Sequence, residues 1–278
     1  MIIKDAFVLA AGLGTRMGDL GKSIPKPLFP VFSKSIVEII INQLSSLGIE
    51  NIYMNSHHKE KVLHRYILSK GIDVKFLSER DLLGSGGAFY NLKSAYPHLG
   101  NVLSLNADTI FDFKSGCVEQ LLSFHRKKKL SVSMMGLKVK ETERFNRLCI
   151  KDGLLKNVLT YDSTTKIKEN PYTFSGVSVV DLDSLSSSHF GKKTSYFDSV
   201  ADFKTKKVGV LEFGRFSFHD FGTIDNYTNS LVNIIENKND FIHSLVDVPD
   251  FEKDSIFCEN DLCHVSISRG KLAHGLKE

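Results

Sequence analysis

The sequence predicts an α/β protein with a mixed, mainly parallel sheet flanked by helices, and three observations lead to this prediction. Strand-like and helix-like runs alternate through the first half of the chain, as in successive βαβ units. The apolar run Ala6–Leu9 leads directly into a glycine loop, which is typical of a strand-to-helix turn. The 278 residues suffice for one large domain, or for one domain with an appendage. We therefore expect a Rossmann-like fold.

Composition and charge narrow the class of protein. Hydrophobic residues make up 42% of the chain and charged residues 24%, which is ordinary for a globular protein. The formal net charge of +4 is small and scattered, so we expect no nucleic-acid partner. No apolar run approaches the roughly 18 to 20 residues of a membrane span, and no signal peptide is recognisable. We expect a cytoplasmic protein with reduced cysteines and no membrane contact, and leave open whether it forms a homo-oligomer.

Each element of the first half follows from its apolar pattern and its end signals. From Ser35 onward apolar residues recur at helical spacing, and Gly48 is a typical helix stop. The buried strand Asn101–Asn106 delivers Asp108 to the carboxyl edge of the sheet, where ligands bind in open α/β folds. The other elements expected here are strands at 51–55 and 73–77 and helices at 59–69, 86–96 and 116–127.

The second half has a different pattern, because strand-like runs follow one another with little helix between them. These runs lie at 130–137, 148–150, 154–160, 173–180 and 208–213, and helices are expected at 195–203 and 223–237. We expect one main domain at 1–237, with a first half at about 1–128 and a more antiparallel second half at about 129–237. Residues 238–278 form a C-terminal extension of unknown role, in which 256–268 reads as two short strands.

The loop after the first strand has the composition of a phosphate site. Small residues from Ala10 to Gly14 allow backbone N–H groups to surround an anion. Arg16 adds a planar fork of donors, and Lys26 adds a mobile point charge between two stiffening prolines. Two better-known glycine motifs do not fit this loop. A Walker loop ending at Gly21-Lys22-Ser23 would need glycine at Arg16, and a dinucleotide fingerprint would need glycine at Met17.

Two isolated aspartates are candidates for binding a divalent cation. Asp108 and Asp220 both follow apolar strands, and Gly222 next to Asp220 permits close approach of the backbone to a ligand. Mg²⁺ prefers a few carboxylate oxygens together with phosphate oxygens and water. Because the opening loop already indicates a phosphate ligand, we favour a metal role for both aspartates over turn or helix-capping roles.

These motifs together resemble the sugar-1-phosphate nucleotidylyltransferases, which join a nucleoside monophosphate to a sugar 1-phosphate. The similar segments are LAAGLGTRM, IPKPL, LLGSGGA, NAD and DFGT, in that order, and the resemblance covers about residues 3–235. The segment TFSGVSV is similar to a strand of the N-acetylmuramate 1-phosphate uridylyltransferases, whereas LLGSGGA is closer to the turn of the guanylyltransferases.

The resemblance implies a fold, a reaction and a set of site residues. It implies the nucleotide-diphospho-sugar transferase fold and direct attack of the sugar phosphate on the α-phosphorus of an NTP. Arg16 would hold the departing pyrophosphate, Lys26 would bridge the two substrates, and Asp108 and Asp220 would bind Mg²⁺. The implied nucleotide-binding residues are Leu9, Ala10, Ala11, Gly12, Gly14, Thr15, Gly84, Ser85, Gly86, Gly87 and Asn106. The implied sugar-binding residues are Ser175, Gly176 and Val177.

Departures from the family pattern keep the substrates open. Ala107 and Phe218 replace a usual glycine and a usual tryptophan, and only Lys166, Lys168 and Glu169 lie where many members carry an EKP motif. The first expectation is UTP with N-acetylmuramate 1-phosphate. Alternatives are GTP with a heptose or mannose 1-phosphate, CTP with phosphocholine, and a non-catalytic nucleotide-sugar-binding regulator. Retention of both metal carboxylates argues against the regulator.

Overall fold

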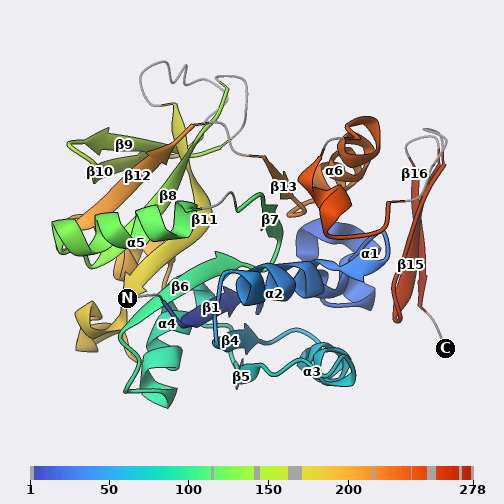
Figure 1. The fold of residues 1–278 in the computed structure, drawn as a ribbon. Coiled ribbons are helices and arrows are strands. Elements are labelled where there is room, and N and C mark those ends of the chain that lie inside the picture. Colours follow the sequence, from blue (N-terminus) through green and yellow to red (C-terminus); the bar gives the residue numbers. More distant parts are fainter. Residues whose placement is uncertain are drawn as a thin grey trace.

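A nine-stranded mixed sheet forms the centre of the computed structural model (Figure 1), which describes residues 3–113, 116–140, 145–161, 171–214, 217–238, 240–248, 255–268 and 271–276. The strands run in the order β5 (Lys75–Ser78), β4 (Asn51–Ser56), β1 (Asp5–Leu9), β6 (Asn101–Asn106), β11 (Tyr172–Asp181), β8 (Val132–Lys138), β12 (Val208–Phe213), β10 (Leu154–Leu159) and β9 (Arg147–Lys151). The four strands from β5 to β6 are parallel, as predicted for the first half. Antiparallel pairs dominate the described strands of the second half, among which only β8 and β12 are parallel.

Alternation along the central strands produces two apolar layers. In β1 the side chains of Ala6 and Val8 enter one core, and Phe7 between them enters the other. The same alternation divides Leu103 from Val102 in β6. Since successive side chains of a strand point to opposite faces, each central strand is covered on both sides. This burial on both faces explains why these strands read as continuous apolar runs.

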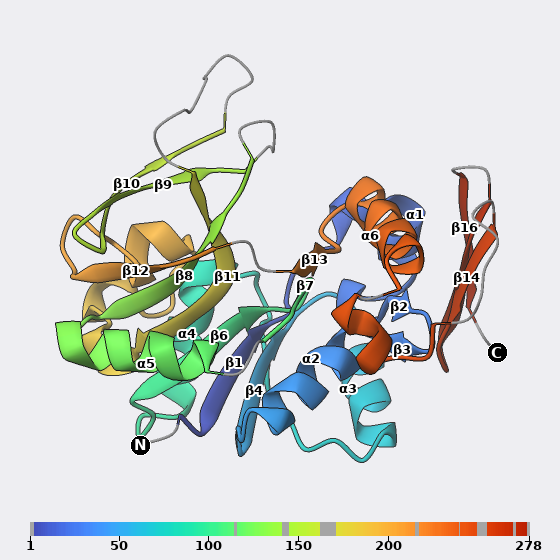
Figure 2. The ribbon, with the colours of Figure 1, turned by 45° about the horizontal axis from the view of Figure 1, so that its top comes forward.

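Helices cover both faces of the sheet (Figures 1 and 2). The longer helices that bury residues in the first core are α2 (Ile36–Ser46), α3 (Glu60–Ser69), α5 (Cys117–Lys128) and α6 (Ile224–Glu236). The opposite face packs against α4 (Gly84–Ala95) and against a single π-helical turn, Tyr196–Val200. The short helix α1 (Gly18–Ser23) and the one-turn helices Thr15–Met17 and Lys26–Leu28 belong to the opening loop.

Two helix predictions need correction at their ends. The helix predicted at 86–96 begins two residues earlier, so that Gly84 and Ser85 form its first turn. The helix predicted at 195–203 is only the π-helical turn, in which Ser195 caps the N-terminus through its side chain. This turn packs against α4, and the contact determines its backbone conformation. Such a tertiary contact cannot be recognised from the periodicity of the local sequence.

Three small sheets complete the fold. They are the hairpin β2 (Pro30–Val31) with β3 (Lys34–Ser35), the pair β7 (Thr109–Phe111) with β13 (Phe218–Asp220), and a C-terminal meander. The meander consists of β14 (Ser255–Glu259), β15 (Cys263–Ser268) and β16 (Lys271–Leu276). Two of its strands match the prediction for 256–268, and β16 is a third strand that was not predicted. Figure 2 shows the meander beside β2, β3 and α6.

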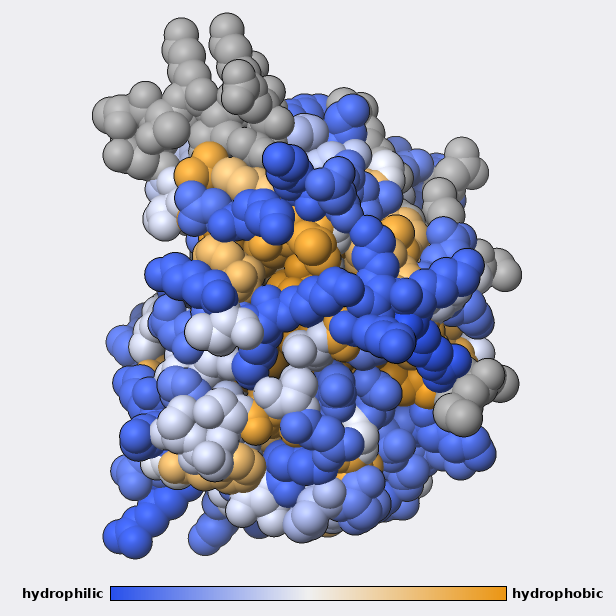
Figure 3. All heavy atoms as spheres, turned by 90° about the vertical axis from the view of Figure 1, so that its left-hand side faces the viewer, coloured by the Kyte–Doolittle hydropathy of each residue, from blue (hydrophilic) through white to orange (hydrophobic). Residues whose placement is uncertain are grey.

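The surface over the β8–β12 end of the sheet is mainly hydrophilic. In Figure 3 apolar side chains show on that face as separate patches between polar and charged ones. Single exposed apolar residues are normal on water-facing surfaces. Within the described part of the chain, no helix combines the length and the hydropathy that crossing a membrane requires.

Candidate functional site

The carboxyl edge of the parallel strands carries a cleft of about 310 Å³. It opens where β1 ends and the opening loop begins, which is where the sequence placed a ligand site. Of the residues predicted to bind nucleotide, phosphate or metal, those that line this cleft are Leu9, Ala10, Ala11, Gly12, Lys26, Gly84, Ser85, Asn106 and Asp108. Asn55, Glu79, Leu82, Pro27 and Ala107 complete the lining. Most of the predicted nucleotide site is therefore brought together at one sheet edge.

A buried chain of hydrogen bonds connects the opening loop to the glycine turn. The backbone N–H of Ala10 donates to Oδ1 of Asn55 at 2.7 Å, and Nδ2 of Asn55 donates to Oε1 of Glu79 at 2.7 Å. The other carboxylate oxygen of Glu79 accepts the N–H of Leu83 at 2.9 Å. Glu79 is only 4% exposed, so its carboxylate is held rigidly in the cleft wall.

Sequence reasoning missed both Asn55 and Glu79. Asn55 is the last residue but one of β4, and Glu79 directly follows β5, the next two strands of the sheet after β1. Polar residues at the carboxyl ends of neighbouring parallel strands meet at one edge, and this signal was present in the sequence.

The glycine turn has two different functions along its length. Gly84 and Ser85 line the cleft, whereas Gly86 and Gly87 are buried behind it. The N–H of Gly86 donates to the carbonyl of Thr194 at 2.9 Å, and a Cβ on Gly86 would collide with the carbonyl of Ser195. Gly86 and Gly87 thus allow α4 to approach the backbone of 192–195 closely.

Lys26 lies at the point where the cleft meets the two aspartates. Its ammonium group forms an ion pair with Oδ2 of Asp108, and the side chains of Lys26 and Asp108 are 13% and 22% exposed. The one-turn helix Lys26–Leu28 fixes its backbone, because the N–H of Phe29 donates to the Lys26 carbonyl at 3.0 Å. A cation held this rigidly beside a carboxylate has a defined position relative to any bound phosphate.

The other half of the opening loop lies outside the cleft lining. Arg16 and Thr15 are exposed in the turn Thr15–Met17, and Gly14 is half-buried with φ of +66°. The predicted roles of Gly14, Thr15 and Arg16 in binding phosphates therefore stay proposals.

The small sheet β7–β13 brings the two predicted metal ligands together. Asp220 pairs with Thr109 in this sheet, and the N–H of Phe221 donates to the Asp108 carbonyl at 2.8 Å. The carboxylate of Asp220 accepts the Gly222 N–H at 2.7 Å and Nδ2 of Asn226 at 2.6 Å. Residues more than a hundred positions apart thus become neighbours.

The electrostatics of this pair fit a divalent cation. Burial raises the pKa of Asp220, and the charge of Asp108 raises it further, against the opposing effects of the Gly222 and Asn226 hydrogen bonds and of Lys26. Two carboxylates that repel each other form a favourable site for a hard cation. No cluster of three or more His, Cys, Asp or Glu occurs within the described residues, so phosphate oxygens and water would supply the remaining ligands of an ion such as Mg²⁺.

A second cavity of about 240 Å³ lies next to the cleft and shares Leu9, Ser85 and Asn106 with it. Gly176 lines this cavity with φ of +90°, and a Cβ there would lie 2.6 Å from Nδ2 of Asn106. Ser175 and Val177 are buried instead, and the Ser175 hydroxyl accepts the Val177 N–H at 3.0 Å.

The three predicted sugar-site residues thus differ in placement, with Gly176 alone at the cavity. Lys166, Lys168 and Glu169, which the sequence placed near an expected sugar-phosphate motif, lie outside the described residues.

Known proteins are similar to this chain in sequence and in fold. The family model described as nucleotidyl transferase matches residues 5–161. A D-glycero-α-D-manno-heptose 1-phosphate guanylyltransferase of Campylobacter jejuni is 26% identical over 82% of this chain and 99% of its own length. A mannose-1-phosphate guanylyltransferase of Mycobacterium tuberculosis is 22% identical over 83% of this chain and 64% of its own length. Among solved structures, HddC from Yersinia pseudotuberculosis superposes with a TM-score of 0.69 at 20% identity, covering 84% of this chain and all of HddC. HddC has also been solved in complex with GMP-PN.

Proposed function

The chain belongs to the nucleotidyl transferase family, as one of its sugar-1-phosphate nucleotidylyltransferases, and from this premise we propose that it transfers the guanylyl group of GTP to a heptose or mannose 1-phosphate. The relatives support the class of donor and acceptor, since two of them are named for GTP-dependent transfer to such sugar phosphates. The observation that carries the choice of base is the buried carboxylate of Glu79 in the wall of the cleft.

A carboxylate in this position selects among bases by its hydrogen-bonding capacity. Both oxygens of Glu79 already accept one hydrogen bond, and each retains a further lone pair. Guanine presents two adjacent donors, its N1–H and its 2-amino group, which match two acceptor oxygens. Uracil presents a single N–H between two carbonyls. These carbonyls are acceptors, like the carboxylate oxygens that they would face, so no second hydrogen bond could form. Cytosine and adenine each present one amino donor beside a ring-nitrogen acceptor, so they match one carboxylate oxygen and not both. This argument favours GTP over UTP, CTP and ATP.

The second cavity favours a neutral sugar. Its described lining consists of hydroxyl, amide, aromatic and aliphatic groups and contains no charged side chain. Tyr196 stacks on Phe174 with ring centroids 5.4 Å apart, and its hydroxyl donates to Ser178 at 2.8 Å. Such a surface suits sugar hydroxyls and C–H faces, whereas the lactyl carboxylate of N-acetylmuramate would be left there without a cation. UTP with N-acetylmuramate 1-phosphate stays the second candidate, because of the TFSGVSV segment.

We propose a single in-line displacement. An oxygen of the sugar phosphate attacks the α-phosphorus, a new P–O bond forms, and the bond from the α-phosphorus to the bridging oxygen breaks with release of pyrophosphate. Backbone groups of the opening loop and of Gly84–Ser85 hold the nucleotide, and Lys26 orients the two phosphates. A Mg²⁺ ion held by Asp108 and Asp220 would neutralise the phosphate charge. Lys26 neutralises Asp108 in the free protein and lines the cleft, so that its ammonium group is placed to interact with bound phosphates.

A substrate panel tests this proposal. GTP, UTP, CTP and ATP are each combined with Mg²⁺ and with heptose, mannose or N-acetylmuramate 1-phosphate or phosphocholine, and pyrophosphate release is measured. We expect the fastest release from GTP with a neutral sugar phosphate, and its loss on chelation of the metal. Faster release with UTP and N-acetylmuramate 1-phosphate would replace the proposed substrates. No release from any pair, together with tight binding of a nucleotide sugar, would identify a non-catalytic regulator.

A further inference from the structure

The described C-terminal residues 240–248 and 255–263 contact both the segment that carries Lys26 and the segment that carries Asp220. In Figures 1 and 2 the meander β14–β16 lies beside α6 and the β2–β3 hairpin, at the far end of the molecule from β9 and β10. We call the described residues 240–248 and 255–263 the C-terminal brace. Two of its side chains, Asn260 and Asp240, bond directly to the segments that carry Lys26 and Asp220.

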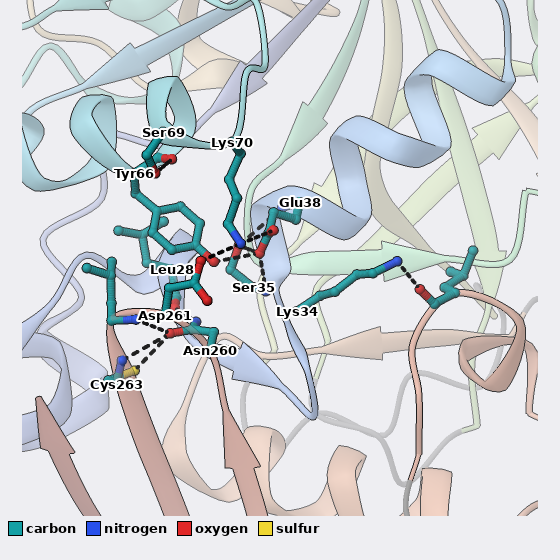
Figure 4. A network of polar contacts seen from close by, with 12 residues as sticks. Leu28, Lys34, Ser35, Glu38, Tyr66, Ser69, Lys70, Asn260, Asp261 and Cys263 are labelled. Atoms are coloured by element: carbon teal, nitrogen blue, oxygen red, sulfur yellow. Dashed lines mark hydrogen bonds and ion pairs between the residues drawn. The ribbon is translucent and has the colours of Figure 1, made fainter. Parts of the chain in front are cut away.

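The first anchor of the brace is Asn260, which holds the Lys26 turn. Its Nδ2 donates to the Leu28 carbonyl at 2.8 Å, and its Oδ1 accepts the N–H groups of Leu262 and Cys263 at 3.0 and 3.1 Å (Figure 4). Asn260 is 4% exposed, so both ends of its amide are bonded in a buried site. Leu28 closes the one-turn helix that begins at Lys26. The amide therefore fixes the turn two residues from the catalytic ammonium group.

In the segment after Leu28, every second backbone carbonyl accepts a hydrogen bond from another part of the chain. The Pro30 carbonyl accepts the Tyr227 hydroxyl, and the Phe32 carbonyl accepts the Glu259 N–H at 2.8 Å. Phe32 has φ of +55° and is 2% exposed. A bulky residue in this left-handed conformation is strained and persists only where its surroundings impose it. The contact with β14 is one such constraint on the hairpin.

The second anchor is Asp240, which holds the strand that ends in Asp220. Both carboxylate oxygens of Asp240 lie within hydrogen-bond distance of Nε2 of His219, at 3.1 and 3.0 Å. Each of the two side chains is 8% exposed. The His219 ring also stacks on Phe241 of the brace, with centroids 5.6 Å apart. His219 directly precedes the proposed metal ligand, so its orientation fixes β13.

We propose that the C-terminal brace positions Lys26 and Asp220 relative to each other, through Asn260 and Asp240, and so sets the turnover rate. The proposal rests on the function proposed above, in which both residues act on the same phosphates. Lys26 and Asp220 are carried by segments far apart in sequence, and the brace bonds to both. Asn260 and Asp240 are positioning residues, because they touch neither cleft nor cavity.

Two substitutions remove one anchor each with little change in volume. Asn260→Asp keeps the acceptor for Leu262 and Cys263 but loses the donor to Leu28. Asp240→Ser loses the bond to His219 but retains a side-chain oxygen for the Ile242 N–H, which Asp240 caps at 3.0 Å. The matched control is Asp261→Asn, which breaks only a surface ion pair with Lys70 (Figure 4).

We expect each anchor variant to lower kcat about tenfold or more and to change KM for GTP less than about twofold, since misplacement acts on the transition state. The control should match wild type. Circular dichroism at the assay temperature reports the folded fraction, and Asp240→Ser carries the test if Asn260→Asp does not fold. Wild-type kcat in a folded anchor variant overturns the proposal, as does a loss confined to KM or one that matches the unfolded fraction. Wild-type protein inactive on every substrate pair instead overturns the proposed function.

Discussion

At the scale of single residues, Lys26 is the group whose removal tests the reaction most directly. We expect Lys26→Ala to lower kcat by about 10²- to 10³-fold, because a preorganised charge at the reacting phosphates is lost. The fold should be retained, since the lysine backbone is held by its own turn. Pyrophosphate release and circular dichroism measure the two quantities. Lys22→Ala, which breaks an exposed pair with Asp19, is the control. Turnover near wild type in Lys26→Ala would refute the role given to this side chain.

Glu79 tests the choice of base. Glu79→Gln replaces one acceptor oxygen by an NH₂ group and leaves the side-chain volume unchanged. We expect kcat/KM for GTP to fall by about 10- to 100-fold and the preference over UTP to narrow, because a donor now faces the donors of guanine. The measurement is the ratio of kcat/KM for the two nucleotides in wild type and variant. An unchanged ratio would show that another group reads the base.

Gly176 tests the position of the second substrate. In Gly176→Ala the new Cβ would lie 2.6 Å from Nδ2 of Asn106, at a φ of +90° that L-residues rarely adopt. Gly176 lines the second cavity but not the cleft, and the Asn106 side chain that it would displace lines both. We therefore expect KM for the sugar phosphate to rise several-fold, with a smaller effect on KM for GTP. Gly214→Ala is the control, since a Cβ there meets no atom within 4 Å. If both substitutions changed KM for the sugar phosphate equally, Gly176 would have no specific role in sugar binding.

At the scale of elements, the start of α2 is a network whose pH dependence can be worked out. Ser35 and Glu38 form a capping box, and the Glu38 carboxylate also accepts the Tyr66 hydroxyl at 2.7 Å and faces Lys70 at 3.4 Å (Figure 4). Burial raises the pKa of Glu38, but bonds from Ser35 and Tyr66 and the charge of Lys70 outweigh burial, so its pKa lies below the ordinary 4.5. A lowered carboxylate pKa stabilises the fold above the unfolded pKa, and this stability is lost as the pH falls through the folded value.

Glu38→Gln should therefore destabilise the protein near neutral pH by about 1 to 3 kcal/mol. The difference from wild type should shrink as the pH falls below about 4.5, because protonated Glu38 then resembles glutamine. Urea unfolding followed by circular dichroism at pH 7 and near pH 4 measures both values. A deficit that is independent of pH would mean that the carboxylate charge contributes nothing to the cap.

Elements differ in how far the sequence predicts them, and the reason is the range of the contacts that form them. The strand at Asn101–Asn106 and the helix from Ser35 were predicted because their own apolar pattern and caps define them. The pair β7–β13 has three residues per strand and exists only because chain segments about a hundred residues apart meet. Their positions after apolar strands and the motif resemblance predicted Asp108 and Asp220 individually, whereas the β7–β13 pairing that brings them together required the fold.

The same reasoning applies to the cleft. Small residues and charges near Ala10 and Lys26 indicated a phosphate site from local sequence. Asn55 and Glu79 act through a hydrogen-bond chain that spans three strands. Their positions at the carboxyl ends of two strands could be read from the sequence, whereas their bonds to Ala10 and Leu83 required the fold. Gly86 and Gly87 were predicted to contact the nucleotide. In the structure they pack against the backbone of 192–195, where a Cβ on either glycine would collide with a carbonyl.

At the scale of the whole molecule, the C-terminal meander shares its core with the first half of the main domain. Ile256, Cys258 and Val265 are buried in the same apolar cluster as β1 and α2. From the sequence alone this segment was predicted only as an extension of unknown role, because its apolar pattern indicates two short strands but not the surface that they cover. A shared core predicts that the extension and the main sheet unfold together.

Ile256→Ala tests this coupling. Ile256 is 2% exposed, and truncation of a fully buried isoleucine costs about 2 to 5 kcal/mol. We expect one cooperative urea transition, shifted to lower urea, that coincides whether it is followed by far-UV circular dichroism or by tyrosine absorbance. Leu68→Ala is the matched control, since Leu68 is 63% exposed and should shift the midpoint little. A separate early transition in Ile256→Ala, with the main one unmoved, would mean that the meander folds on its own. The brace would then lack the rigid support that holding Lys26 and Asp220 in place requires.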